Sequence, residues 1–169
     1  CLIFIVDDEH FGLEPQAEKP VPYPYKNAAE LLAACERTGL SISSLAMENE
    51  LVFHTREEIY AHFARIREVM EEAIARGIHT EGLLPGPLRV QRRAPSLNRA
   101  LESTARLSVD PMAVLDWINM FALAVSEENA AGGRVVTAPT NGACGVIPAV
   151  LAYWAKFIGE PKPEPCLRF

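Results

Sequence analysis

The chain has 169 residues, of which 49% are hydrophobic and 22% are charged, so it can form a packed core and is not disordered as a whole. Its formal net charge of −6 argues against nucleic acid and against an anionic membrane as partners, because both are polyanions. Four widely spaced cysteines, with neither a signal peptide nor an apolar run of membrane-spanning length, predict a cytoplasmic protein.

The first 26 residues are predicted to form a short strand and an extended connector. Residues 1–6 (CLIFIV) are apolar, and alternate prolines at positions 20, 22 and 24 enforce an extended backbone. A single strand has no partner of its own, and no later segment has strand character. We therefore expect this strand to pair with another chain or to belong to a preceding domain.

Helices are predicted to dominate from residue 27 onward. Capping signals predict one helix between Asn27 and Gly39, and a short second helix follows over residues 43–53. A capping box at Thr55 opens a third helix that ends near Gly77, with apolar residues at three- and four-residue steps. Most of the chain is therefore expected to be helical.

The segment 79–99 is rich in glycine, proline and arginine, and it contains no acidic residue after Glu81. This composition predicts a loop or strap rather than a helix. Asp110 and the proline after it predict the start of the next helix, MAVLDWINMFALAV, which is almost entirely apolar. At about 15 residues this helix is too short to span a membrane, and 169 residues are too few to bury it completely, so we expect that some surface of a partner is missing.

The candidate binding segment is the glycine-rich stretch 127–145. Because Pro148 is tolerated only in a first helical turn, the last helix is predicted to begin just after Thr140, Asn141 and Gly142. The N–H groups at such a helix start favour an anion, for example the carboxylate of a small substrate. The more common alternative is that Thr140 or Asn141 simply caps the helix.

The polar residues before this loop have two interpretations each. Arg134 is suited to bind a carboxylate with two hydrogen bonds, or to pair with Glu127 or Glu128. Asn129 is either a polar ligand or, preferably, a helix cap. The two glutamates are interpreted as a solvated helix end rather than as a general acid and base.

No other motif assigns a reaction. Cys144 lies near a positive helix end, which lowers a thiol pKa, but no histidine pattern supports a nucleophile, so a buried small residue is favoured. Zinc-ligand spacings, a Walker loop and GxGxxG are absent, and no lysine near the glycines suits pyridoxal phosphate.

Longer stretches of the sequence resemble one family. SEENAAGGRVVTAPTNGACGVIPAVLAYW is similar to the signature of the bacterial iron–sulfur L-serine dehydratases, as are FIVDDEHFG, PVPYPYKNAAELL, TEGLLPGPLRVQRRA and DPMAVLDWINMFALAV. The resemblance implies a mainly α, bundle-like catalytic-domain segment with a short N-terminal strand and a proline-rich connector. In its terms, residues 1–26 end a preceding domain, residues 27–158 open the helical catalytic domain, and residues 159–169 form an extended tail.

The resemblance also implies an activity, the deamination of L-serine to pyruvate and ammonia. In the family a [4Fe-4S] cluster, and not pyridoxal phosphate, acts as the Lewis acid. The family's cluster cysteines have no counterpart here, so we expect no metal ligand in this chain and no activity from the chain alone. The catalytic base is not identified. The residues expected near L-serine are Thr137, Thr140, Asn141, Gly142, Arg134 and, more weakly, Asn129.

Two alternatives remain open at this point. The chain is either a non-catalytic helical module that completes a partner's site, or part of a related lyase that acts on threonine or cysteine. The missing remainder of the enzyme or a second subunit is an expected partner, and a homo-oligomer is the expected assembly.

Overall fold

The computed structural model describes residues 4–6, 20–104, 112–137 and 141–159. The protein is mainly helical, as predicted, and it divides into two compact units. Residues 20–64 form the described part of the first unit, and the other described residues form the second. Helix α3 (Arg56–His79) begins in the first unit and continues in the second.

The first unit confirms the predicted caps of helix α1 (Ala28–Thr38). The Asn27 side chain accepts a hydrogen bond from the Glu30 N–H, and Gly39 ends the helix with a φ of 71°. Helix α2 (Ile42–Glu50) lies where the second helix is predicted, but it ends three residues earlier than residue 53.

The connector before α1 is joined to α2 by a pair of hydrogen bonds. The Tyr23 N–H donates to Asn49 Oδ1 at 2.9 Å, and Asn49 Nδ2 donates to the Tyr23 carbonyl at 2.8 Å. Because one side chain satisfies both backbone groups of Tyr23, the extended connector has a fixed register against α2.

The capping box at the start of α3 is also confirmed. The Thr55 N–H donates to Glu58 Oε2 at 2.8 Å, and the Glu58 N–H donates to Thr55 Oγ1 at 3.3 Å. The hydrogen bond from the Thr55 N–H, together with one from the Thr55 hydroxyl to Glu58 Oε2 at 3.0 Å, lowers the pKa of Glu58. The helix runs two residues beyond the predicted end at Gly77.

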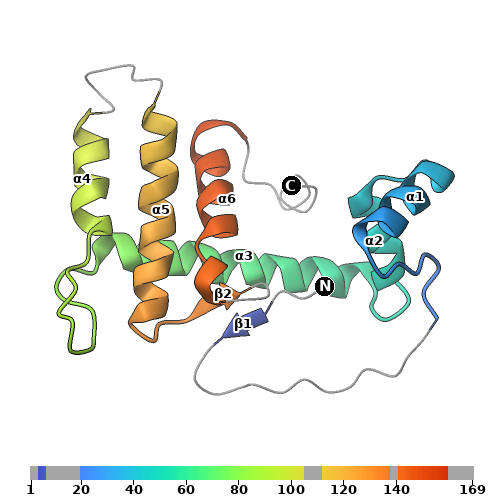
Figure 1. Cartoon of the computed structure of the whole chain (residues 1–169), viewed down its shortest axis with the longest axis horizontal. Helices are drawn as coiled ribbons and strands as arrows, with labels where there is room; N and C mark the ends of the chain where they lie inside the picture. The colour runs from blue at the N-terminus through green and yellow to red at the C-terminus, as the bar shows by residue number, and fades with distance from the viewer. Residues whose placement is uncertain (1–3, 7–19, 105–111, 138–140, 160–169) are drawn as a thin grey trace. The chain divides into compact units, whose positions relative to one another are not determined.

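The second unit contains three helices that stand side by side with α3 crossing them (Figure 1): α4 (Ala94–Thr104), α5 (Ala113–Ala130) and α6 (Val146–Phe157). Helix α5 packs against both α4 and α6. Two glycines allow close approach to α5. A Cβ on Gly77 would collide with the Ala124 backbone, and one on Gly145 would lie 2.7 Å from the Ala122 carbonyl oxygen.

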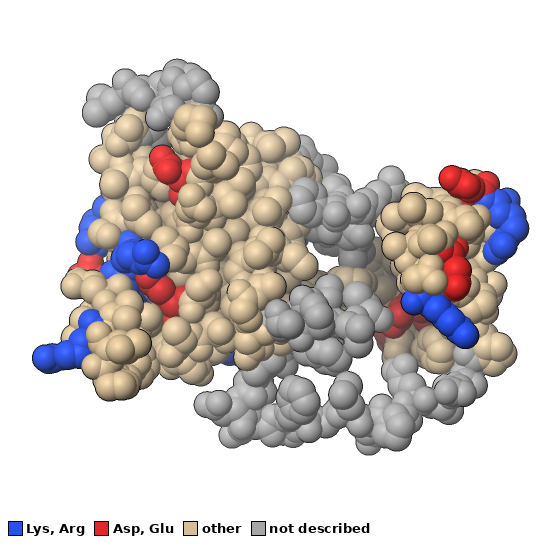
Figure 2. Space-filling view, in the orientation of Figure 1, with Lys and Arg blue, Asp and Glu red and all other residues tan. Residues whose placement is uncertain are grey.

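The strap prediction is correct for residues 80–93, which we call the strap, but wrong for His79, which ends α3, and for residues 94–99, because α4 begins at Ala94. Pro95 lies in the first turn of α4, where its missing N–H has no intrahelical acceptor, so it does not interrupt the helix. Basic side chains gather over the strap and the start of α4 in the space-filling view, whereas much of the neighbouring face carries none (Figure 2).

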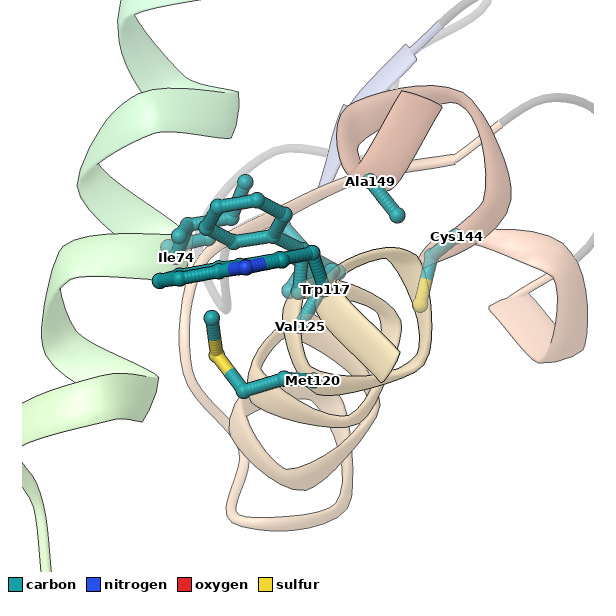
Figure 3. Close-up of a cluster of buried hydrophobic side chains, with 9 residues drawn as sticks. Ile74, Trp117, Met120, Val125, Cys144 and Ala149 are labelled. Atoms are coloured by element: carbon teal, nitrogen blue, oxygen red, sulfur yellow. The ribbon is translucent and has the colours of Figure 1, made fainter. Parts of the chain in front are cut away.

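The core of the second unit is centred on α5. Trp117, Met120 and Val125 pack with Ile74 of α3 and with residues at the start of α6 (Figure 3). In the described part of the chain, the start of α5 is incompletely buried, as the length of the chain leads us to expect. There Leu115 is 52% exposed, and its neighbour Val114 is 39% exposed. Asp110, the predicted cap of this helix, lies outside the described residues.

A two-stranded antiparallel sheet joins β1 (Phe4–Val6) to β2 (Val135–Thr137), with Phe4 opposite Thr137. The first strand therefore pairs within its own chain, and the prediction that it needs another chain or a preceding domain is wrong in this respect. The three residues of β2 are too few to show a strand pattern in the sequence, but all three are buried.

In the described ranges, no helix combines the length and the apolar character needed to cross a membrane. Of the tail predicted over residues 159–169, the described part includes Gly159 alone.

Candidate functional site

The candidate site begins at the C-terminal end of α5, where two consecutive carboxylates are buried. Glu127 is 4% exposed and Glu128 is 5% exposed. The interpretation of this pair as a solvated helix end is therefore wrong. Their burial depends on partners from other elements, which a local sequence pattern does not reveal.

Glu127 caps the start of α4. Its Oε1 accepts a hydrogen bond from the Arg93 N–H at 2.8 Å, and its Oε2 accepts one from the Ala94 N–H at 3.3 Å. These N–H groups have no acceptor within their own helix, and a negative charge complements the positive end of the helix dipole. Glu127 thus joins α5 to α4.

Glu128 is held by two arginines. Arg76 Nε of α3 donates to Oε2 at 3.0 Å, and Arg92 Nη1 of the strap donates to Oε1 at 2.7 Å. The Arg92 side chain is itself 7% exposed. A buried carboxylate is tolerated only when such charged donors satisfy it, so these contacts explain why Glu128 lies in the interior.

The turn after α5 leads directly from Glu128 into β2. The Gly133 N–H donates to the Glu128 carbonyl at 2.9 Å, and Gly132 has a φ of 75°, which favours glycine. Arg76 Nη2 also donates to the Arg134 carbonyl at 2.7 Å. The start of β2 is therefore fixed by backbone and side-chain hydrogen bonds together.

The sequence offers an ion pair of Arg134 with Glu127 or Glu128 as the alternative to substrate binding. Among the described residues, the structure shows neither of these two pairs. In the part of the chain that is described, Glu127 and Glu128 form their ion pairs with Arg76, Arg92 and Arg93.

Thr137 ends β2 with a buried polar atom. The residue is 6% exposed, and its Oγ1 has no hydrogen-bond partner among the described residues. Leaving a buried hydroxyl unsatisfied costs about 1–3 kcal/mol. A ligand that supplies a donor or an acceptor at this hydroxyl would remove that cost.

The next described residues are Asn141 and Gly142, which are exposed on the short helix η1 (Asn141–Ala143). Since three residues separate Thr137 from Asn141, their Cα atoms lie at most about 14 Å apart. Thr140, the remaining residue predicted in this loop, lies outside the described residues.

Helix α6 begins at Val146, as the position of Pro148 predicts. Its N-cap is Gly145, and no side chain caps it. The alternative in which Asn141 caps this helix is therefore wrong. The first N–H groups of α6 favour a negative charge, as the helix dipole does.

Asn129 and Cys144 also differ in part from their sequence interpretations. Ala131, not Asn129, is the C-cap of α5, and the Asn129 carbonyl accepts a hydrogen bond from the Gly132 N–H at 3.1 Å. Cys144 is buried in the core, as favoured, and burial raises the pKa of its thiol. Burial outweighs the opposing effect of the backbone N–H, so the pKa of this thiol is not lowered as the sequence predicts.

The cysteines in the described ranges do not fit a four-iron cluster. They are Cys35 in the first unit and Cys144 in the second. Cysteine thiolates hold such clusters, in most cases four of them. Across the described residues, no three His, Cys, Asp or Glu side chains are grouped so that they could hold a metal ion.

Fold and site together define a mainly helical domain in which a buried strand ends at Thr137, whose hydroxyl has no hydrogen-bond partner among the described residues, a few positions before η1 and the start of α6. The sequence model of the family described as "Serine dehydratase alpha chain" matches residues 37–169. The chain belongs to this family, which confirms the resemblance found in the sequence.

Individual relatives extend the match over almost the whole chain. L-serine dehydratase 1 of Escherichia coli (strain K12) is 60% identical over 166 residues, which cover 98% of this chain and 37% of the relative. The L-serine dehydratase of Haemophilus influenzae is 60% identical over 161 residues, covering 95% and 35%. The Streptomyces coelicolor L-serine dehydratase is 44% identical over 169 residues, covering 98% and 36%. The chain thus spans about a third of the length of these curated relatives.

Proposed function

We propose that this chain is part of an L-serine dehydratase, which eliminates water from L-serine to give pyruvate and ammonia. The observation that carries the proposal is the 60% identity over 166 residues to a protein named L-serine dehydratase 1. The family match over residues 37–169 supports the same assignment.

Within this enzyme, the segment between α5 and α6 binds the substrate. L-Serine presents a carboxylate and an ammonium group on one carbon, so its site needs both donors and acceptors close together. The buried hydroxyl of Thr137 can donate or accept a hydrogen bond, and it has no other partner among the described residues. The residues assigned to substrate binding are Thr137, Thr140, Asn141, Gly142 and Arg134, with Asn129 as a weaker candidate.

The start of α6 contributes an electrostatic preference. Its N–H groups and its dipole favour the carboxylate end of the amino acid, and no side chain caps them. Thr137 and Asn141 flank the three residues that lead toward this helix start. Binding the carboxylate here would orient the α-carbon relative to the residue that removes its proton.

The cluster implied by the family resemblance is not assigned to this chain. Cys144 is buried and burial raises the pKa of its thiol, so it is a poor cluster ligand. We therefore propose that the cluster thiolates come from sequence outside these 169 residues and that the chain alone is inactive.

Anaerobic reconstitution of the 169-residue chain with iron and sulfide tests this proposal. We expect no pyruvate from L-serine, no stoichiometric iron and no broad absorption at the blue end of the visible spectrum. A brown protein that turns over L-serine would contradict the argument about the missing ligands.

Substrate choice is tested in the complete enzyme that contains this segment. We expect kcat/KM to be largest for L-serine when L-serine, L-threonine and L-cysteine are compared. A preference for threonine or cysteine would favour the related-lyase alternative, and absence of turnover with all three would favour a non-catalytic module.

A further inference from the structure

The turn between α5 and β2 packs closely against the Glu128 carboxylate at Gly133. A Cβ on Gly133 would lie 2.9 Å from Glu128 Oε2 and 3.1 Å from the Glu128 carbonyl oxygen. The same Oε2 accepts the hydrogen bond from Arg76 Nε. The carboxylate is therefore enclosed between the arginine on one side and the turn on the other.

Arg76 links this carboxylate to the strand through a single guanidinium group. Nε donates to Glu128 Oε2 at 3.0 Å, and Nη2 donates to the Arg134 carbonyl at 2.7 Å. The guanidinium is planar and rigid, so the two acceptors are held at a fixed spacing. Lysine has one ammonium group and does not reproduce this geometry.

The strand then transmits that position to the end of β2. Thr137 lies three residues beyond Arg134, and the strand between them is buried and paired with β1. Because the paired and buried strand has little freedom to deform, a shift of the Arg134 carbonyl also moves the Thr137 hydroxyl. Misplacement of a substrate-positioning group by about 1 Å can cost an enzyme about 100-fold in efficiency.

We propose that Arg76 and Glu128 are positioning residues for the amino-acid site, acting through the Arg134 backbone and β2 on the Thr137 hydroxyl. This inference rests on the proposed function, because it assumes that Thr137 contacts L-serine. Neither residue contacts the substrate itself. Their role is to set where the substrate-binding groups lie.

Arg76→Lys in the complete enzyme is the direct test. Arg92 still neutralises Glu128 in this variant, so folding should be retained. We expect the KM for L-serine to rise by about tenfold, with kcat changed by less than about threefold and the melting temperature by only a few degrees. Arg67→Lys is the matched control, since Arg67 lies on the same helix, is similarly exposed and pairs with Glu71 at 3.1 Å. Its KM should be unchanged.

Gly133→Ala provides a second variant that leaves every charge in place. Its methyl group would press on Glu128 Oε2, so the KM should rise in the same direction as for Arg76→Lys. If both variants lose thermal stability while the folded fraction keeps the KM of the unsubstituted enzyme, the network is purely structural and the proposal is wrong.

Hydrogen exchange separates this proposal from the proposed function. In the 169-residue chain, Arg76→Lys should speed amide exchange in Val135–Thr137 and leave the middle of α5 unchanged, whereas Arg67→Lys should do neither. Unchanged exchange in β2 overturns the positioning role whether or not the enzyme acts on L-serine. Faster exchange in β2 together with a KM insensitive to Thr137→Val supports the coupling and overturns the assignment of Thr137 to the substrate.

Discussion

The two ends of β2 are stabilised in different ways. Before the strand, Glu128 and the turn are held by arginines from α3 and from the strap, all with hydrogen-bond partners. At its end, Thr137 has a buried hydroxyl without a partner in the described part of the chain, and Asn141 is exposed beyond it. The Glu128 carboxylate is satisfied internally, whereas the end of the strand retains polar groups that a ligand could use. The contrast indicates that the first end supports the second.

Glu128→Leu removes the carboxylate that holds the start of β2. This variant should have the largest effect on the free energy of unfolding. It leaves the buried Arg92 without its carboxylate, and breaking a buried ion pair in this way costs about 3–5 kcal/mol. The measurement is urea denaturation of the 169-residue chain. Glu71→Gln removes an exposed carboxylate from α3 and should change the free energy of unfolding by less than about 1 kcal/mol. Equal effects of the two variants would contradict the contrast.

Thr137→Val should have opposite effects on stability and on function. Valine has the shape of threonine without the unsatisfied hydroxyl, so the chain should be stabilised by about 1 kcal/mol. In the complete enzyme, kcat/KM for L-serine should fall by about 10- to 100-fold, because a bound group loses its partner. Denaturation and steady-state kinetics measure the two effects. Destabilisation with unchanged kinetics would mean that the hydroxyl serves the fold.

Asn141→Ala should lower turnover of L-serine while changing the free energy of unfolding by less than about 0.5 kcal/mol. The reason is that Asn141 is exposed and does not cap α6. Asn49→Ala is a contrasting variant, since Asn49 bonds both backbone groups of Tyr23 and should lose stability. If Asn141→Ala loses stability and keeps its activity, Asn141 is a structural residue.

Because the Cys144 thiol is buried, we expect the free energy of unfolding to depend slightly on pH. Burial raises the pKa of its thiol above the ordinary value of 9.0, so the unfolded chain releases this proton at a lower pH than the folded chain. The contribution of this group is constant well below pH 9.0 and is lost as the pH rises above that value. Denaturation at several pH values, with Cys144→Ala as the control that lacks this slope, measures the effect. A steeper loss in the control would contradict it.

Local signals predicted much of the helical structure. The caps at Asn27, Gly39 and Thr55 involve residues a few positions apart, so the sequence contains all their partners. The start of α6 follows from the fixed φ of Pro148 for the same reason. The composition of residues 79–99 does not predict α4, because Pro95 counts there as a loop signal although a first helical turn accepts proline.

The predicted substrate residues share one stretch of sequence, and its glycines and the family resemblance both identified that stretch without its geometry. It did not reveal that the Thr137 hydroxyl is unsatisfied, because this depends on which groups surround it after folding. Nor did it reveal the role of Arg76, which lies 52 residues before Glu128. An arginine on the last turns of an amphipathic helix is otherwise typical of a solvated face.

By itself, the sequence determined the helical class, the helix caps, the glycine-rich loop and the family, since each depends on neighbouring residues or on an extended match. Only the tertiary structure decided that β1 pairs with β2, that Glu127 and Glu128 are buried, and that the Thr137 hydroxyl has no hydrogen-bond partner in the described ranges. The physical reason is that burial and charge pairing depend on groups brought together from distant parts of the chain, and a carboxylate in the interior is stable only where those groups meet it.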